Sequence, residues 1–161
     1  MYKFRGRTPQ KMWVKGYYFA KPILDKHFIL NGDEQWAVEK ETVGMYVGND
    51  KLGNELYVGD IVSYHWSPEC PAIKMVITYE KGICLLEPVT STCPHHDKCV
   101  TPPDIYKPCP LWGILINEQF DNIQLMSNIF DMPNLTKDLI CKTKSSDLVF
   151  SFVFFVHSNS I

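Results

Sequence analysis

Cysteine and histidine, the residue types best suited to metal binding and catalysis, gather in one proline-rich stretch of the chain. Residues 88–110 hold three of the six cysteines and two of the five histidines. Thiolate and imidazole are the ligands that tetrahedral zinc prefers in proteins. Cys93, His95, Cys99 and Cys109 are therefore a candidate zinc site, and zinc is the one cofactor that the sequence suggests.

Two features of this stretch weigh against both metal binding and catalysis. Five residues separate Cys93 from Cys99, more than the about two to four of a zinc knuckle, and no Cys-x-x-Cys pair follows. Cys93, His95 and Asp97 are residues of the kinds that serve as nucleophile, base and orienting acid in catalysis. Catalytic groups are brought together by the fold, however, and residues this close along an extended loop point in different directions. Since the chain also lacks a phosphate-binding Gly-rich loop and a His-Glu-x-x-His motif, we expect no enzymatic activity.

A second group of functional residue types lies at the start of the chain. Aromatic and basic residues interleave there, as in proteins that bind single-stranded nucleic acid by stacking on bases and contacting phosphates. The candidate nucleic-acid contacts are Arg5, Arg7, Lys11, Trp13 and Lys15. The alternative is structural, because aromatic residues at alternate positions of a strand fill a core while the lysines face water. We favour the structural alternative.

The composition excludes several broad classes of protein. A chain of 161 residues suits one domain, and its 45% hydrophobic content suffices for a buried core. The net charge of −2 creates no overall field that attracts nucleic acid. The start of the chain lacks a signal-peptide pattern, and no stretch is long enough to span a membrane. We therefore expect a cytoplasmic protein with reduced cysteines and no membrane partner.

The elements that must position these residues are mostly strands, because β-prone runs alternate with turn residues at short intervals. Asn31-Gly32-Asp33 and Glu80-Lys81-Gly82 are predicted hairpin turns. The predicted strands cover residues 12–19, 27–30, 36–38, 61–66, 74–79, 83–87, 112–116 and 123–129, and the predicted core includes Val76, Ile77, Leu85 and Leu86. Residues 88–110 are predicted to form a long irregular insertion, because proline disrupts ladders of backbone hydrogen bonds.

The last part of the chain has two further predicted segments. Asp131-Met132-Pro133 has the residue types of a helix start, which predicts a short helix over residues 134–141. Residues 142–161 form an extension with an uncharged apolar run, 148–156, that favours a strand. This strand either packs on the domain or pairs with a second subunit to form a homo-oligomer. We favour packing within the chain.

Several separated pieces of the chain form an ordered series. They are Lys3-Phe4-Arg5-Gly6, Trp13-Val14 with Gly16-Tyr17, Thr42-Val43-Gly44 with Tyr46 and Gly48, Gly53 with Glu55-Leu56-Tyr57, Gly59-Asp60-Ile61-Val62, and Asn128-Ile129-Phe130-Asp131 with Pro133 and Leu135. In order and spacing, the series resembles the YopX family. No single piece is specific, and the resemblance depends on the combination over residues 3–135. The insertion at 88–110 and the segment after Cys141 depart from the family's pattern.

The resemblance implies a mostly β protein of bacteriophages and prophages, with strongly bent sheets and no established enzymatic activity. Together with the strand pattern, it predicts a mainly β fold of strongly bent antiparallel sheets, in a small barrel-like domain over residues 1–141 with one short C-terminal helix. The predicted function is that of a phage accessory protein that binds a host or phage protein and inhibits a bacterial defence or regulatory factor. The alternative is a nucleic-acid-binding β module in phage replication or transcription.

Overall fold

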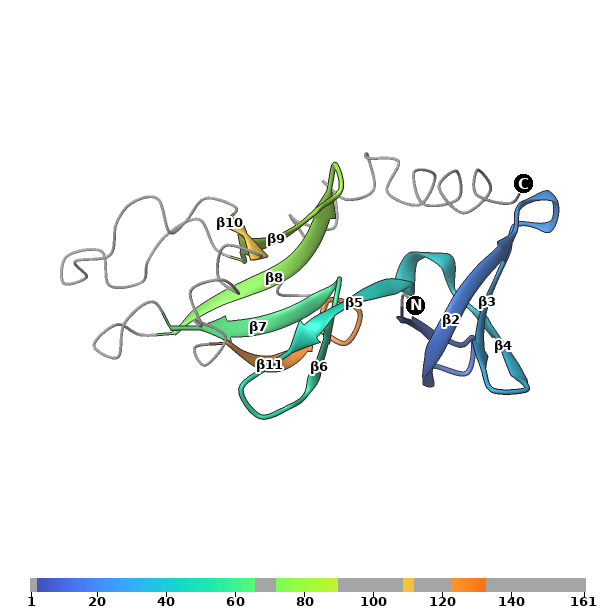
Figure 1. Cartoon of the computed structure of the whole chain (residues 1–161), viewed down its shortest axis with the longest axis horizontal. Coiled ribbons are helices and arrows are strands. Elements are labelled where there is room, and N and C mark those ends of the chain that lie inside the picture. Colours follow the sequence, from blue (N-terminus) through green and yellow to red (C-terminus); the bar gives the residue numbers. More distant parts are fainter. Residues whose placement is uncertain (1–2, 66–71, 90–108, 112–122, 133–161) are drawn as a thin grey trace.

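The computed structural model describes residues 3–65, 72–89, 109–111 and 123–132, which form two antiparallel sheets (Figure 1). The first sheet has the order β4-β3-β2-β1-β5-β6, built from β1 (Phe4–Arg7), β2 (Trp13–Lys21), β3 (Lys26–Asn31), β4 (Glu34–Val38), β5 (Gly44–Asn49) and β6 (Glu55–Tyr57). The second has the order β10-β9-β8-β7-β11, built from β7 (Asp60–Tyr64), β8 (Ile73–Glu80), β9 (Ile83–Pro88), β10 (Cys109–Pro110) and β11 (Ile123–Asn128). Two short 3₁₀ helices, η1 (Pro22–Leu24) and η2 (Lys40–Thr42), lie between strands of the first sheet. The mainly β prediction is confirmed.

The described strands form two open sheets, so the prediction of a barrel-like domain is wrong for this part of the chain. β6 and β7 are consecutive in sequence but belong to different sheets. Only Val58 and Gly59 connect them, and Gly59 has a φ of 92°, a conformation that favours glycine. The chain turns away at this point instead of pairing β7 with β6. In Figure 1, β5 extends from the other strands of the first sheet toward the second sheet.

Both predicted hairpin turns are confirmed. Asn31 pairs with Glu34, which leaves Gly32 and Asp33 as a two-residue turn with a φ of 60° at Gly32. In the second hairpin Glu80 pairs with Ile83, and Lys81 and Gly82 have φ values of 50° and 88°. Two successive positive φ values are the signature of the type I′ turn that suits twisted strands.

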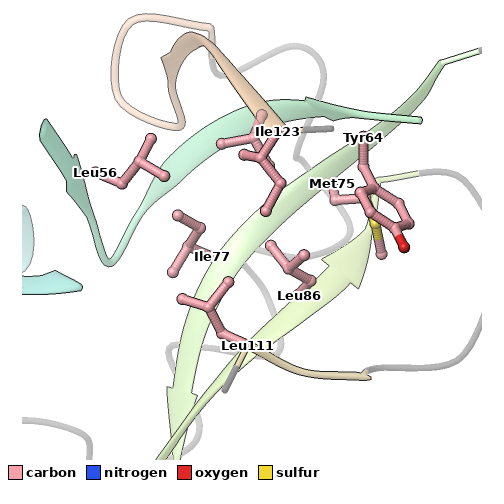
Figure 2. Packing of buried hydrophobic residues seen from close by; sticks show 8 residues of the cluster. Leu56, Tyr64, Met75, Ile77, Leu86, Leu111 and Ile123 are labelled. Atoms are coloured by element: carbon pink, nitrogen blue, oxygen red, sulfur yellow. The ribbon is translucent and has the colours of Figure 1, made fainter. Parts of the chain in front are cut away.

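The largest core lies on the second sheet, where side chains from several strands meet (Figure 2). Its buried members are Leu56, Val62, Tyr64, Met75, Ile77, Leu86, Leu111 and Ile123. Leu56 comes from β6, so the first sheet contributes to this core as well. The prediction of buried Val76, Ile77 and Leu86 is confirmed, whereas Leu85 is only half-buried. Adjacent residues of a strand face opposite sides, and Leu86 takes the core side.

The predicted irregular insertion is wrong at both of its ends. Pro88 is the last residue of β9 and pairs with Met75, while Cys109 and Pro110 form β10 opposite Leu86 and Leu85. A proline is tolerated in β10 because β10 is an edge strand, where an outward position needs no N–H donor. Residues 90–108, the predicted strand at 112–116, the predicted helix at 134–141 and the extension 142–161 lie outside the described residues. Within the described residues, no helix is long and apolar enough to cross a membrane.

Candidate functional site

Arg5 lies where the two sheets meet, and groups from three other strands enclose its guanidinium. The guanidinium carbon is 4.5 Å from the ring centroid of Trp13 on β2 and 4.6 Å from that of Tyr57 on β6. Arg5 Nη2 donates a hydrogen bond of 2.6 Å to Oδ1 of Asp60, the first residue of β7. Asp60 is fully buried, so the ion pair connects the two sheets away from water. We refer to Arg5, Trp13, Tyr57, Asp60 and Asn128 as the junction.

Asp60 accepts hydrogen bonds from the junction with both of its carboxylate oxygens. Oδ2 accepts from the backbone N–H of Tyr57 at 2.8 Å, and Oδ1 also accepts from Nδ2 of Asn128 at 3.2 Å. Asn128 Oδ1 in turn accepts from the backbone N–H of Phe130 at 2.9 Å, which holds the end of β11 in place. Burial raises the pKa of Asp60, and the charge and hydrogen bond of Arg5 offset that effect only in part.

The guanidinium of Arg5 is satisfied as much by aromatic rings as by hydrogen bonds. Its Nε is buried and has no hydrogen-bond partner among the described residues. The rings of Trp13 and Tyr57 lie within cation–π distance of the cation, and arginine suits such stacking because its guanidinium is planar and weakly hydrated. The junction is therefore a packed structural centre, and the Arg5–Asp60 ion pair is the contact whose loss should destabilise it most.

Basic side chains around the junction are paired with two glutamates. Glu55 accepts hydrogen bonds from Lys3, from Lys15 at 2.8 Å and from the hydroxyl of Tyr57 at 2.9 Å. Glu39 pairs with Lys11 and, at 3.3 Å, with Nη2 of Arg7. All five candidate nucleic-acid contacts thus lie in one region, but each of the four basic ones has a carboxylate partner. The fifth, Trp13, stacks on Arg5 and lies near Phe130, with 6.3 Å between ring centroids.

The hydrogen bonds from two lysines to Glu55 make the stability of the folded chain depend on pH. Hydrogen bonds from Lys15 and Lys3 lower the pKa of Glu55 to about 2, from an ordinary value of 4.5. A lowered pKa in the folded state stabilises the protein above pH 4.5, and this contribution is lost as the pH falls toward about 2. Because all three side chains are partly exposed, we expect a contribution of only about 1 kcal/mol.

Urea unfolding at pH 7 and pH 3 measures this contribution, with Glu55→Gln as the comparison. Between the two pH values, the free energy of unfolding is expected to fall by about 0.6 kcal/mol more in the natural chain than in the variant, because part of the contribution remains at pH 3. Glu39 and Asp50, whose pKa values are also lowered, remain in both chains and cancel in the comparison. Equal losses in the two chains would rule out this role of Glu55.

A second polar group lies at the end of the first sheet where β2 joins β3. The hydroxyl of Tyr18 is 2.6 Å from Nδ1 of the buried His27, and Nε2 of His27 is 3.5 Å from a carboxylate oxygen of Asp25. The Tyr18 and His27 rings stack with 6.0 Å between centroids. Burial, and then the charge of Asp25, raise the pKa of Tyr18. A neutral tyrosine bonded to a stacked imidazole orients both rings and fixes the pairing of β2 with β3.

The candidate zinc ligands remain almost wholly outside the described residues. Cys93, His95 and Cys99 are not among them, and Cys109 is placed only by its backbone in β10. In the described part of the chain, no three His, Cys, Asp or Glu side chains are grouped so as to hold a metal ion. Cys84 is a free, half-buried cysteine whose thiol pKa is raised by burial. The zinc site therefore stays a prediction.

Asp60 and Asn128 are junction residues that the sequence analysis did not single out for a role. Arg5 and Asp60 are 55 positions apart, and Asn128 is 68 positions beyond Asp60, so no local spacing connects them. The sequence carried only an indirect signal, since each junction residue belongs to one of the separated pieces of the ordered series.

Comparisons of the chain with family models, with curated proteins and with solved structures found no significant match. The fold and the junction therefore define the class of this protein by themselves. Over its described residues, the chain has two antiparallel β-sheets joined through a buried arginine–aspartate pair between aromatic rings.

Proposed function

We propose that this chain is a YopX-type phage accessory protein without enzymatic activity, which acts by binding a host or phage protein and inhibits a bacterial defence or regulatory factor. One observation carries the choice of a protein partner. The four basic candidates for phosphate contact, Arg5, Arg7, Lys11 and Lys15, are engaged by carboxylates, whereas large apolar side chains at several turns are exposed. Exposed apolar groups on connecting loops suit contacts with another protein.

The proposed membership of the YopX family rests on the ordered series of sequence pieces, and residues from several of these pieces lie together in the fold. Arg5, Trp13, Tyr57, Asp60 and Asn128 come from separate parts of the series and meet in the junction. Residues that jointly hold two sheets together are the kind that a shared fold requires. The partner is to be found by experiment.

The experiment is affinity capture from a bacterial lysate with the tagged full-length chain, with and without nuclease treatment. We expect a nuclease-resistant host protein at a stoichiometric ratio to the bait. A second bait, Asp60→Ala, tests whether capture needs the intact fold, because the broken junction destabilises the chain and a partner of the folded protein should be captured less. Recovery of proteins only through nucleic acid would contradict the proposal and favour the nucleic-acid-binding alternative.

The alternative, a nucleic-acid-binding β module in phage replication or transcription, has one observation in its favour. Arg5, Arg7, Lys11, Trp13 and Lys15 do lie together on neighbouring strands and the turn between them. To bind a nucleic acid there, phosphates have to displace Glu39 and Glu55 from the lysines and Arg7. Titration of a labelled single-stranded oligonucleotide at low salt tests this alternative, and a flat isotherm excludes it.

A further inference from the structure

The loop between β2 and β3 presents two apolar side chains to solvent. Lys21 and Lys26 face each other as the last paired residues of the hairpin, which leaves residues 22–25 as its tip. At the tip, Ile23 is 99% exposed and Leu24 is 60% exposed. Figure 1 shows this loop at the far end of β2 and β3, away from the second sheet. We refer to residues 21–26 as the hairpin tip.

The hairpin tip is closed by a backbone hydrogen bond and by contacts with neighbouring residues. Pro22 begins the 3₁₀ helix η1, and Asp25 ends it with φ 45° and ψ 42° and donates its backbone N–H to the carbonyl of Pro22 at 3.1 Å. The Asp25 carboxylate lies 3.7 Å from the ammonium of Lys40 and 3.5 Å from Nε2 of His27. A surface that is already ordered loses little conformational entropy on binding. The exposure of Ile23 and Leu24 is thus a feature of an ordered turn.

The charge around the two apolar side chains is positive. Lys21 and Lys26 border them on the two strands, and both lysines are exposed. The ammonium of Lys21 lies 5.3 Å from the ring centroid of Phe28, which supports it without neutralising it. The one carboxylate of the tip, Asp25, faces Lys40. A complementary surface therefore combines an apolar pocket with a border of carboxylates.

Other kinds of occupant fit this surface less well. A stable anchor on an anionic membrane takes a cluster of about four to eight basic residues, and the tip itself carries two lysines. Single-stranded nucleic acid binds through aromatic stacking, and residues 21–26 contain no Phe, Tyr or Trp. A pocket in another protein, by contrast, is able to cover the whole of Ile23 and Leu24.

We propose that the hairpin tip is the docking element for the partner protein, with Ile23 and Leu24 entering an apolar pocket that Asp or Glu side chains border. The inference rests on the proposed function, because it assigns the contact surface for a protein partner. Ile23 and Leu24 supply the buried contact, and Lys21 and Lys26 set its orientation and its dependence on salt.

The test uses affinity capture with four full-length tagged chains: the natural chain, Ile23→Ser with Leu24→Ser, Lys21→Glu with Lys26→Glu, and Leu52→Ser. Leu52 is the matched control, since it is 64% exposed on a different turn. All exchanged side chains are exposed, so equal melting temperatures should confirm that every variant folds. The captured host protein is quantified by mass spectrometry and then purified for titration.

We expect the serine pair to weaken binding by roughly tenfold or more and the glutamate pair to weaken it most at low salt, while Leu52→Ser binds as the natural chain does. If a host protein is captured equally by the serine pair, the docking inference is wrong and the proposed function stands. If the natural chain captures no protein from lysates of either uninfected or phage-infected bacteria, both are wrong. Binding to phosphatidylcholine–phosphatidylserine vesicles through the tip, without a captured protein, would also overturn the inference.

Discussion

Replacing Asp60 with alanine is expected to lower the free energy of unfolding by about 3–5 kcal/mol, because it leaves a buried cation without its counter-charge. Arg5 then stays enclosed between Trp13 and Tyr57 with no carboxylate to accept from Nη2. The change also removes the acceptor of the Tyr57 backbone N–H and of the Asn128 amide. Urea unfolding measures the loss.

The matched control removes both charges with Arg5→Met and Asp60→Ala together. A buried ion pair replaced by apolar groups is often close to neutral in stability, whereas a lone buried charge is costly. We therefore expect the double variant to be more stable than Asp60→Ala alone. If the double variant is as unstable as the single one, the unpaired Arg5 is not the cause, and the hydrogen bonds to Tyr57 and Asn128 carry the loss instead.

Local sequence patterns were sufficient for the hairpins. A two-residue turn needs a positive φ at particular positions, and Gly32 and Gly82 supply it with little steric cost. Both turns, and the strands on either side of them, could therefore be predicted from a few neighbouring residues. The same reasoning extends to β8 and β9, whose pairing follows from the turn that joins them.

The junction could not be predicted in this way, because its partners are far apart in the chain. Taken locally, Arg5 among aromatic and basic residues fits either a phosphate contact or a structural role, and its actual partner cannot be identified. Its partner Asp60 is 55 positions away, and the glutamates that pair with Lys15 and Lys11 are 40 and 28 positions away. Only the fold brings these charges together, so their neutralisation is a property of the tertiary structure.

The barrel prediction was wrong for a related reason. Consecutive short strands usually pair, and β6 and β7 are separated by two residues. The chain instead leaves the first sheet at Gly59 and enters the second. The N–H of Gly59 donates to the carbonyl of Ile77 in the second sheet at 2.8 Å. Gly59 also accepts a hydrogen bond from Ile129 just after β11, at 3.0 Å. Contacts with β8 and with the residue after β11 thus place this connection in the second sheet, and no local pattern carries that information.

Replacing Asp50 with alanine is expected to lower the free energy of unfolding by about 2–4 kcal/mol, because several donors lose their acceptor at once. The buried Asp50 carboxylate accepts from the backbone N–H groups of Leu52, Asn54 and Leu125, at 2.9, 2.8 and 3.0 Å, and from Nδ2 of Asn54 at 2.9 Å. Desolvation by itself would raise the pKa of Asp50, but the bonds from Asn54, Leu125 and Leu52 outweigh it and lower the pKa.

The bond to Leu125 distinguishes this carboxylate from an ordinary loop cap, because Leu125 lies on β11 in the other sheet. Amide hydrogen exchange at Leu125 should therefore become faster in Asp50→Ala, in addition to the loss measured by urea unfolding. Asn54→Ala is the control, since it removes one side-chain donor and leaves the three backbone hydrogen bonds intact. For this variant we expect the free energy of unfolding to fall by about 0.5–1.5 kcal/mol and the exchange at Leu125 to stay unchanged. If exchange at Leu125 is the same in both variants, Asp50 stabilises only its own turn, and Arg5–Asp60 is left as the main polar connection between the sheets.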